Sequence, residues 1–342
     1  MVSTTQTEPK HLQLLVRNVT SLADGVLGLT LVSADGLALP GWSAGAHISL
    51  TLASGAVRAY SLCGDPAERC EYQIAVQRED LGRGGSLEIH ERQLAGKHLK
   101  VSPPVNVFEM VDADHYVFIA GGIGITPLLP MLRKVVAGSA SWELHYLGKR
   151  RQRMAFLDEL QCLGVGVRGL VNVVARDQSP RWDLKAALLN IPADAAVYCC
   201  GPNELLNQLE SAHANSTVPF SLHMERFGRI EMLPVQERAE APPPDEDLQP
   251  CDPQGEFEIE LARDGLIIKV AAGESVLEAV RGVRTGLSFS CSDGYCGTCE
   301  TRVLSGIPDH RDSVLTYAEK HANKSMMICV SRACTRRLRL DL

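Results

Sequence analysis

The chain has 342 residues, which is too long for one compact domain and fits two or three. Hydrophobic residues make up 45% of it and charged residues 22%, ordinary globular values that exclude disorder or fibrous structure for the chain as a whole. The 41 acidic residues outnumber the 34 basic ones and give a net charge of −7, which argues against a nucleic-acid-binding protein because such proteins normally carry a basic face.

The sequence indicates neither a leader nor a membrane span. Residues 1–9 lack the basic and apolar segments of a signal peptide, and the longest uncharged run, 116–132, is broken by three glycines and two prolines. We therefore expect a cytoplasmic protein that contacts no membrane. The eleven cysteines do not fit a small secreted disulfide scaffold, so we expect no disulfide framework.

Short alternating runs occupy the chain up to about residue 112. Apolar and polar residues alternate in 12–16, 48–52 and 72–76, and Gly, Pro and Asp turns separate the runs. A period of two is typical of half-buried strands, so several such strands predict a small antiparallel barrel or sandwich.

Two segments of this first domain suit a flavin. Residues 58–61 offer a cation, an aromatic ring and a hydroxyl, and strand alternation places Arg58 and Tyr60 on one face. After the strand that contains Val76, the run 82–86 forms a turn able to present several N–H groups to a phosphate. Each segment alone is equally typical of an ordinary strand or turn, but together they favour a flavin mononucleotide (FMN) site.

From Tyr116 the pattern changes to apolar strands that alternate with helix-like segments. The predicted strands are 116–120, 144–147, 170–174 and 195–199, and the clearest helices are 128–136 and 184–189. This alternation predicts βαβ units and a parallel sheet.

Two glycine turns follow strands of this second domain. The strand 116–120 runs into the glycines of 121–124, where we expect Thr126 to cap a helix and Pro127 to take its first position. Such a turn offers N–H groups to a pyrophosphate, although glycine can also serve packing alone. A second strand ends at Gly201 and Pro202, and open parallel sheets bind ligands at such strand ends.

A basic run at 149–151 follows the second strand of the sheet. Cations at this place can accommodate the 2′-phosphate of NADPH, whereas an acidic residue there would favour NADH. A solvated basic turn and a contact with an acidic partner are the alternatives.

The segment 231–254 is rich in proline and acidic residues and predicts an extended linker. We therefore expect a barrel domain over 1–112, an α/β domain over 113–230, the linker over 231–254 and a small domain over 255–342.

The last domain carries the most specific motif of the chain. Four cysteines have the C-x₄-C-x₂-C spacing with a fourth thirty residues further on, which is typical of a plant-type [2Fe–2S] site: Cys291, Cys296, Cys299 and Cys329. Gly294 and Gly297 let the backbone approach the cluster sulfides. Zinc is the alternative, but it usually requires two C-x₂-C pairs or histidine ligands, and only one such pair is present. Four unrelated thiols are the other alternative.

The surroundings of this loop predict a small sheet crossed by one helix. We expect a strand over 267–270, a helix that begins after Ser275 as its cap, and a closing strand over 338–342.

Six motifs occur in one order and carry a resemblance to a known family. They are RAYSLC (58–63), GRGGS (82–86), GGIGITP (121–127), YCCGP (198–202), the cysteine loop and ICVSRA (328–333). The chain resembles the phthalate dioxygenase reductase family, which includes vanillate O-demethylase reductases, over nearly its whole length. The resemblance implies a multidomain α+β fold: a flavin-binding antiparallel barrel, a nicotinamide-binding domain with a parallel sheet, and a β-grasp ferredoxin domain.

The resemblance also implies roles for individual residues. FMN contacts are implied for Arg58, Ala59, Tyr60, Ser61, Ala75, Val76, Gly82, Gly84, Gly85 and Ser86. Nicotinamide-nucleotide contacts are implied for Gly121, Gly122, Gly124, Thr126, Gly201 and Pro202. Cys200, the one catalytic candidate, is implied to pack near the nicotinamide and shape the hydride geometry. Phe227 resembles an aromatic beside the flavin ring, and a core aromatic before the linker is the alternative.

The implied function is electron transfer from NADH through FMN and the cluster to a terminal Rieske-type oxygenase of aromatic catabolism. A nicotinamide delivers two electrons as hydride and a [2Fe–2S] cluster accepts one, so a flavin belongs between them. No Rieske ligand pattern can be read in the chain, so the oxygenase must be a separate partner, and the reductase itself is expected to be a monomer. A non-Rieske acceptor, such as a diiron monooxygenase or a cytochrome, and a non-enzymatic redox sensor are the alternatives.

Overall fold

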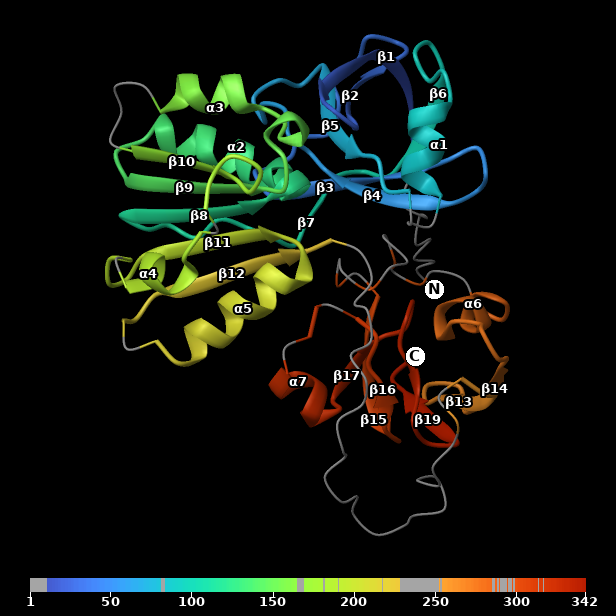
Figure 1. The fold of residues 1–342 in the computed structure, drawn as a ribbon. Helices are drawn as coiled ribbons and strands as arrows, with labels where there is room; N and C mark the ends of the chain where they lie inside the picture. Colours follow the sequence, from blue (N-terminus) through green and yellow to red (C-terminus); the bar gives the residue numbers. More distant parts are fainter. Residues whose placement is uncertain are drawn as a thin grey trace, which may run out of the picture. The chain divides into compact units, whose positions relative to one another are not determined.

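The computed structural model is described here for most of the chain (Figure 1). The described residues are 11–80, 84–164, 169–180, 182–189, 191–216, 218–227, 252, 254–284, 287, 289, 294, 297, 299–312, 314–315 and 317–342. They belong to two compact units, one within Pro9–Phe227 and one within Gly228–Leu342. Except for Asp252 and Gln254, the predicted linker 231–254 lies outside the described residues.

The first unit begins with an antiparallel barrel. Its strands have the order β4-β3-β6-β1-β2-β5, with β7 paired to β3, and a bridge between Leu62 and Ile74 joins the two ends of the order. The elements are β1 (Leu12–Ala23), β2 (Val26–Ser33), β3 (Ala46–Thr51), β4 (Val57–Ser61), β5 (Glu71–Gln77), α1 (Gly85–Glu91), β6 (His98–Val101) and β7 (Val105–Asn106). Inward-facing residues such as Leu31, Ile48 and Leu50 are fully buried, as the alternating pattern predicts.

A parallel five-stranded sheet with the order β10-β9-β8-β11-β12 completes this unit. Its elements are β8 (His115–Gly121), η1 (Gly122–Gly124), α2 (Ile125–Val136), β9 (Ser141–Gly148), η2 (Arg151–Arg153), α3 (Leu157–Leu163), β10 (Gly169–Ala175), α4 (Leu184–Leu189), β11 (Ala196–Gly201), α5 (Asn203–Ala214) and β12 (Ser221–Arg226). Helices α2 and α3 cover one face, and α4 and α5 cover the other (Figure 1). The strand order reverses between β8 and β11, so both glycine turns lie where such sheets bind ligands.

The predicted cap at Thr126 is wrong. A 3₁₀ turn over Gly122–Gly124 leads directly into α2, which begins at Ile125, and the Thr126 hydroxyl instead donates to the carbonyl of Ile123 at 2.9 Å. Pro127 accordingly occupies the third position of the helix. Its missing N–H is tolerated there because the first four N–H groups of a helix have no partner within the helix.

Arg133 of α2 ties the sheet to the barrel. Its guanidinium donates to the carbonyls of Cys63 and Gly64 at 2.7 and 2.6 Å, and to Glu159 of α3 at 2.7 Å. The main chain adds a bond from the N–H of Asp24 to the carbonyl of Gln152 at 2.8 Å. These contacts fix the barrel against α2 and against the η2 turn that follows β9.

The second unit has a five-stranded sheet of order β14-β13-β19-β15-β17 and a small β16-β18 pair. Its elements are β13 (Phe257–Leu261), β14 (Leu266–Val270), α6 (Val276–Arg281), β15 (Glu300–Ser305), β16 (Pro308–Asp309), α7 (Tyr317–Ala322), β17 (Ser325–Met327), β18 (Arg332–Ala333) and β19 (Arg337–Leu340). Ser275 caps α6 as predicted, in a reciprocal capping box with Glu278. In the part of the chain described, no helix is both long and apolar enough to cross a membrane.

Arg332, three residues after Cys329, is a buried anchor of this unit. It is 3% exposed, donates to the carbonyls of Glu274, Gly255 and Ala271, and lies over the Phe257 ring at 4.9 Å. These acceptors come from separate segments, so Arg332 holds the segments together.

We expect Arg332→Met to lower the free energy of unfolding of this unit by about 2–4 kcal/mol, because the variant loses the hydrogen bonds that a buried guanidinium donates to three carbonyls. Denaturant titration of the full chain, followed by the visible absorbance of the iron–sulfur cluster that the sequence predicts, measures the change. Arg339→Met is the control, since Arg339 pairs with Glu260 while 48% exposed, and should cost under about 1 kcal/mol. Equal midpoints for the two variants would contradict the anchoring role.

Candidate functional site

A cavity of about 720 Å³ lies where the parallel sheet meets the barrel. The residues that line it include both glycine turns and the end of β5: Gln77, Arg78, Glu79, Asp80, Gly121, Gly122, Gly124, Gly201, Pro202 and Phe227. Sequence-predicted nucleotide residues and Phe227 are therefore brought together in one cavity, at the switch point of the sheet.

The two glycine turns interlock behind the cavity. A Cβ on Gly121 would lie 2.5 Å from Pro202 Cδ, and a Cβ on Gly124 would lie 2.1 Å from the carbonyl oxygen of Cys200. Gly122 has a φ of +56°, a conformation that side chains disfavour. Glycine thus serves packing between the turns and also leaves the turn backbone open to a ligand.

Two of the predicted residues are buried and are not part of the cavity lining. The side chains of Thr126 and Cys200 are buried at 2% and 0% exposure, and neither residue lines the cavity. Burial, with the nearby Glu225 and Cys199, raises the pKa of the Cys200 thiol well above its ordinary value. Cys200 is therefore a neutral thiol that can shape the site but is not a thiolate nucleophile.

Glu225 is a site residue that the sequence did not reveal. It lies on β12 in register with Cys200, is 5% exposed, and accepts a hydrogen bond from Ser61 of the barrel at 3.5 Å. Burial raises its pKa to about 8, and the Ser61 hydroxyl offsets this only in part. A protonatable carboxyl thus joins the predicted flavin strand to the predicted nicotinamide turn.

We expect Glu225 to make the folded protein less stable as the pH rises. Its pKa is above the ordinary 4.5, so the folded state retains a proton that the unfolded state loses, and stability falls between about pH 5 and pH 8. Glu225→Gln should remove this loss, and the variant should gain a few kcal/mol relative to the parent across that window. Denaturant titrations at pH 5.5, 7 and 8.5 measure this pH dependence, and Glu109→Gln, at an exposed position, is the control. Parallel profiles of stability against pH for the parent and Glu225→Gln would contradict the raised pKa of Glu225.

The predicted flavin residues converge on β4 and the start of α1. A Cβ on Gly85 would lie 2.8 Å from Arg58 Cγ, so the arginine side chain packs directly on the glycine. Gly84 has a φ of +78° directly before α1, and Ser86 accepts a hydrogen bond from the N–H of Glu79 at 3.1 Å.

The remaining flavin predictions divide into three groups. Ala59 lies half-buried on β4, and Tyr60 packs partly buried against the barrel core. Ala75 and Val76 of β5 are buried at 4% and 1% exposure, and neither residue lines the cavity. Gly82 lies outside the described residues.

The second unit brings together the two described cysteines of the cluster motif. Cys299 and Cys329 are 3% and 6% exposed, and the N–H of Ile328 donates to the carbonyl of Cys299 at 3.5 Å. Gly294 and Gly297 have φ values of +74° and +73°, which glycine adopts without strain. Cys291 and Cys296 lie outside the described residues. Two buried cysteines on segments joined by a main-chain hydrogen bond, together with the two glycines, fit an iron–sulfur cluster.

Several cations line the cavity at the ends of β9 and β10. They are Lys149, Arg150, Arg153 and Arg176. Part of the basic run that the sequence singled out therefore borders this cavity, and cations there suit a negatively charged ligand.

An antiparallel barrel fixed to a parallel sheet with a shared cavity, followed by a ferredoxin-type unit, defines a reductase of the ferredoxin-reductase type. Residues 259–334 match the family described as the 2Fe-2S iron-sulfur cluster binding domain. The chain is 41% identical to phenoxybenzoate dioxygenase subunit beta of Ectopseudomonas oleovorans, over 94% of each chain.

Two solved structures extend this likeness to the whole fold. Phthalate dioxygenase reductase, described as a modular structure for electron transfer from pyridine nucleotides to [2Fe–2S], is 31% identical with a TM-score of 0.72, over 97% of this chain and 98% of that one. An intact type IV self-sufficient cytochrome P450 monooxygenase is 38% identical with a TM-score of 0.75 over 97% of this chain, which spans 41% of the P450 chain. The chain belongs to the phthalate dioxygenase reductase family, which confirms the predicted family, fold class and oxidoreductase activity.

Proposed function

We propose that this chain carries electrons from NADH through FMN and a [2Fe–2S] cluster to a separate terminal oxygenase of the Rieske type. One observation carries the proposal: a single cavity joins the glycine turns of a doubly wound sheet to the barrel, in a chain that also holds an iron–sulfur domain. The flavin converts a two-electron hydride into single electrons for the cluster. The protein supplies the positions of the groups.

The proposed roles of the site residues divide between the two units. The glycine turns and Pro202 seat the nicotinamide nucleotide, with Cys200 behind them as a spacer. Arg58, with the start of α1, holds the flavin phosphate, and Phe227 borders the ring. Cys291, Cys296, Cys299 and Cys329 hold the cluster. We keep the domain limits 1–112, 113–230 and 255–342, with 231–254 as the linker.

The proposal includes a monomer that acts in the cytoplasm. Among the described cysteines none forms a disulfide bond, which suits a reducing compartment. The names of the relatives, which are dioxygenase components, support an oxygenase as the electron acceptor.

A cytochrome is the second candidate acceptor. The reductase-like part of the self-sufficient P450 is 38% identical to this chain, a closer match than the 31% of phthalate dioxygenase reductase. This likeness supports a haem protein as the alternative electron acceptor.

Reconstitution distinguishes the two acceptors. The purified reductase and NADH are combined with a Rieske dioxygenase or with a cytochrome P450, and NADH consumption coupled to product is measured. The proposal expects coupled turnover with the Rieske protein to be at least tenfold faster, about 1.4 kcal/mol in barrier. Faster turnover with the P450 would transfer the assignment to the second candidate, and no acceptor reduction at all would favour the sensor alternative.

NADH rather than NADPH is the proposed donor, although cations line the cavity. We expect kcat/KM for NADH to exceed that for NADPH, and Arg150→Ala to lower the NADPH value more than the NADH value because only NADPH carries a 2′-phosphate. Steady-state kinetics with an artificial acceptor give both values. Equal efficiencies for the two nucleotides would overturn the assignment of NADH.

A further inference from the structure

Asp312 is a fully buried carboxylate beside the cysteine loop. Its side chain is 0% exposed, and Oδ2 accepts hydrogen bonds from the N–H groups of Val314 and Leu315 at 3.1 and 2.8 Å. Oδ1 accepts one from the Ser331 hydroxyl at 3.4 Å. Ser331 follows Cys329 by two residues, so the carboxylate links its own turn to the segment of a cluster ligand.

The turn built on Asp312 supports both glycines of the cysteine loop. A Cβ on Gly294 would lie 3.1 Å from Asp312 Cα, and a Cβ on Gly297 would lie 3.6 Å from Val314 Cγ1. A carboxylate that accepts from the N–H groups two and three residues ahead fixes such a turn. The turn that this carboxylate fixes therefore lies directly against both glycines.

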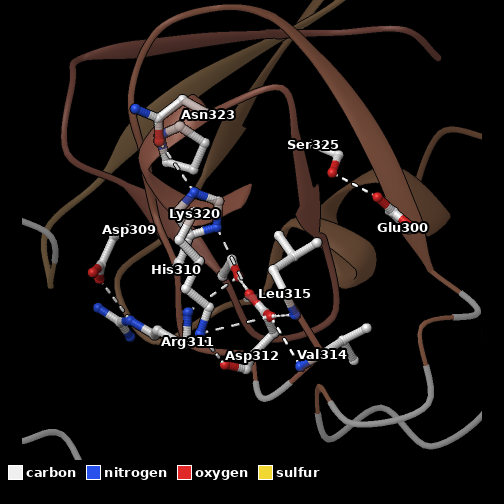
Figure 2. Close-up of polar contacts among 12 residues, drawn as sticks. Glu300, Asp309, His310, Arg311, Asp312, Val314, Leu315, Lys320, Asn323 and Ser325 are labelled. Carbon is white, nitrogen blue, oxygen red and sulfur yellow. Dashed lines mark hydrogen bonds and ion pairs between the residues drawn. The ribbon is translucent and has the colours of Figure 1, made fainter. Parts of the chain in front are cut away.

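Two basic side chains face the carboxylate (Figure 2). Lys320 Nζ lies 3.8 Å from Oδ2 and donates to the Asp312 carbonyl at 2.5 Å, while His310 Nδ1 lies 3.7 Å from Oδ1. Burial alone would raise the pKa of Asp312, but His310, the Leu315 N–H and Lys320 outweigh it and hold the pKa below its ordinary value. The carboxylate is therefore ionised at neutral pH.

We infer that Asp312 is a positioning residue for the [2Fe–2S] loop and that its buried negative charge lowers the reduction potential of the cluster. The inference rests on the cluster assignment and goes beyond it. Reduction adds one electron to the cluster, and a fixed negative charge in a low-dielectric interior opposes this addition more strongly than an exposed charge does. Lys320 acts in the opposite direction, because its ammonium compensates the carboxylate.

The test is a redox titration of the purified full-length chain, with cluster reduction followed by visible absorbance and electron paramagnetic resonance. Asp312→Asn should raise the ratio of reduced to oxidised cluster at a fixed potential about tenfold, which is about 59 mV for one electron. Lys320→Gln should lower the same ratio. Glu300→Gln is the matched control: Glu300 is exposed although it adjoins Cys299, and its removal should change the ratio less than threefold.

Opposite signs for Asp312→Asn and Lys320→Gln support the inference, because a purely structural role predicts no such reversal. An unchanged ratio for Asp312→Asn with full iron and sulfide content would overturn it, as would equal shifts in Glu300→Gln. If Asp312→Asn loses its cluster, the Lys320→Gln variant is decisive. A lower ratio of reduced to oxidised cluster in that variant supports the inference, and an unchanged or higher ratio overturns it. A parent protein without a cluster spectrum would refute the cluster assignment itself, which separates that failure from failure of the inference.

Discussion

Replacing Cys329 by serine is expected to remove the iron–sulfur chromophore and to slow acceptor reduction at least about 100-fold. Cys329 is buried beside Cys299, and a serine hydroxyl replaces the soft thiolate that iron–sulfur clusters require. Flavin reduction by NADH should continue at the parent rate, because the cavity that we propose for the nucleotide belongs to the other unit. Iron and sulfide analysis tests the loss of the cluster. Stopped-flow measurement of flavin bleaching tests the rate of flavin reduction.

Cys334→Ser is the matched control for this variant. Cys334 lies five residues later in the same unit, and its Sγ contacts the carbonyl of Pro308 at 3.7 Å. We expect it to retain the chromophore and the rate of acceptor reduction. Full iron and sulfide content in Cys329→Ser would remove Cys329 from the ligand set.

A second large effect is expected from Gly124→Ala. The added methyl would lie 2.1 Å from the carbonyl oxygen of Cys200, so the interlocked turns must separate. A displacement of about 1 Å at a hydride-transfer site can cost about 100-fold in rate, and we expect a loss of this order in the rate of flavin reduction by NADH. The dissociation constant for NADH should rise as well, because the variant displaces the turn that we propose to seat the nucleotide.

Gly138→Ala provides the control at the other end of the same helix. Its added methyl would lie 3.4 Å from the nearest atom, the carbonyl oxygen of Val135, which is an acceptable contact. Flavin reduction should remain within about twofold of the parent rate in this variant, as is usual for changes away from a site. Unchanged kinetics in Gly124→Ala would show that the turn does not position the nucleotide.

Much of the fold could be predicted because its signals are local. Alternation predicted the barrel strands, strand–helix alternation predicted the parallel sheet, and the cap at Ser275 follows from a short local pattern. The cap at Thr126 failed because helical conformation begins earlier, in a 3₁₀ turn that needs no side-chain cap. Sequence identifies a glycine turn, but the exact start of the helix depends on how the turn packs.

Candidate site residues could be predicted where they belong to contiguous motifs. They could not be predicted where strands far apart in the sequence meet. The glycine turns and cluster cysteines are local patterns, whereas Glu225 gains its role from Ser61, 164 residues away, and from its register with Cys200. The role of Asp312 could not be predicted from the sequence either, because its burial depends on Ser331 and on the loop glycines. Burial of a charged side chain by segments far apart in the chain leaves no local signal.

The most direct test of the proposed electron path is an anaerobic titration of the purified protein with NADH, followed by visible absorbance. The proposal predicts that flavin and iron–sulfur absorbance are both lost, with about three electrons taken up per chain, two by the flavin and one by the cluster. A cluster that stays oxidised while NADH persists would contradict transfer from the nucleotide through the flavin to the cluster.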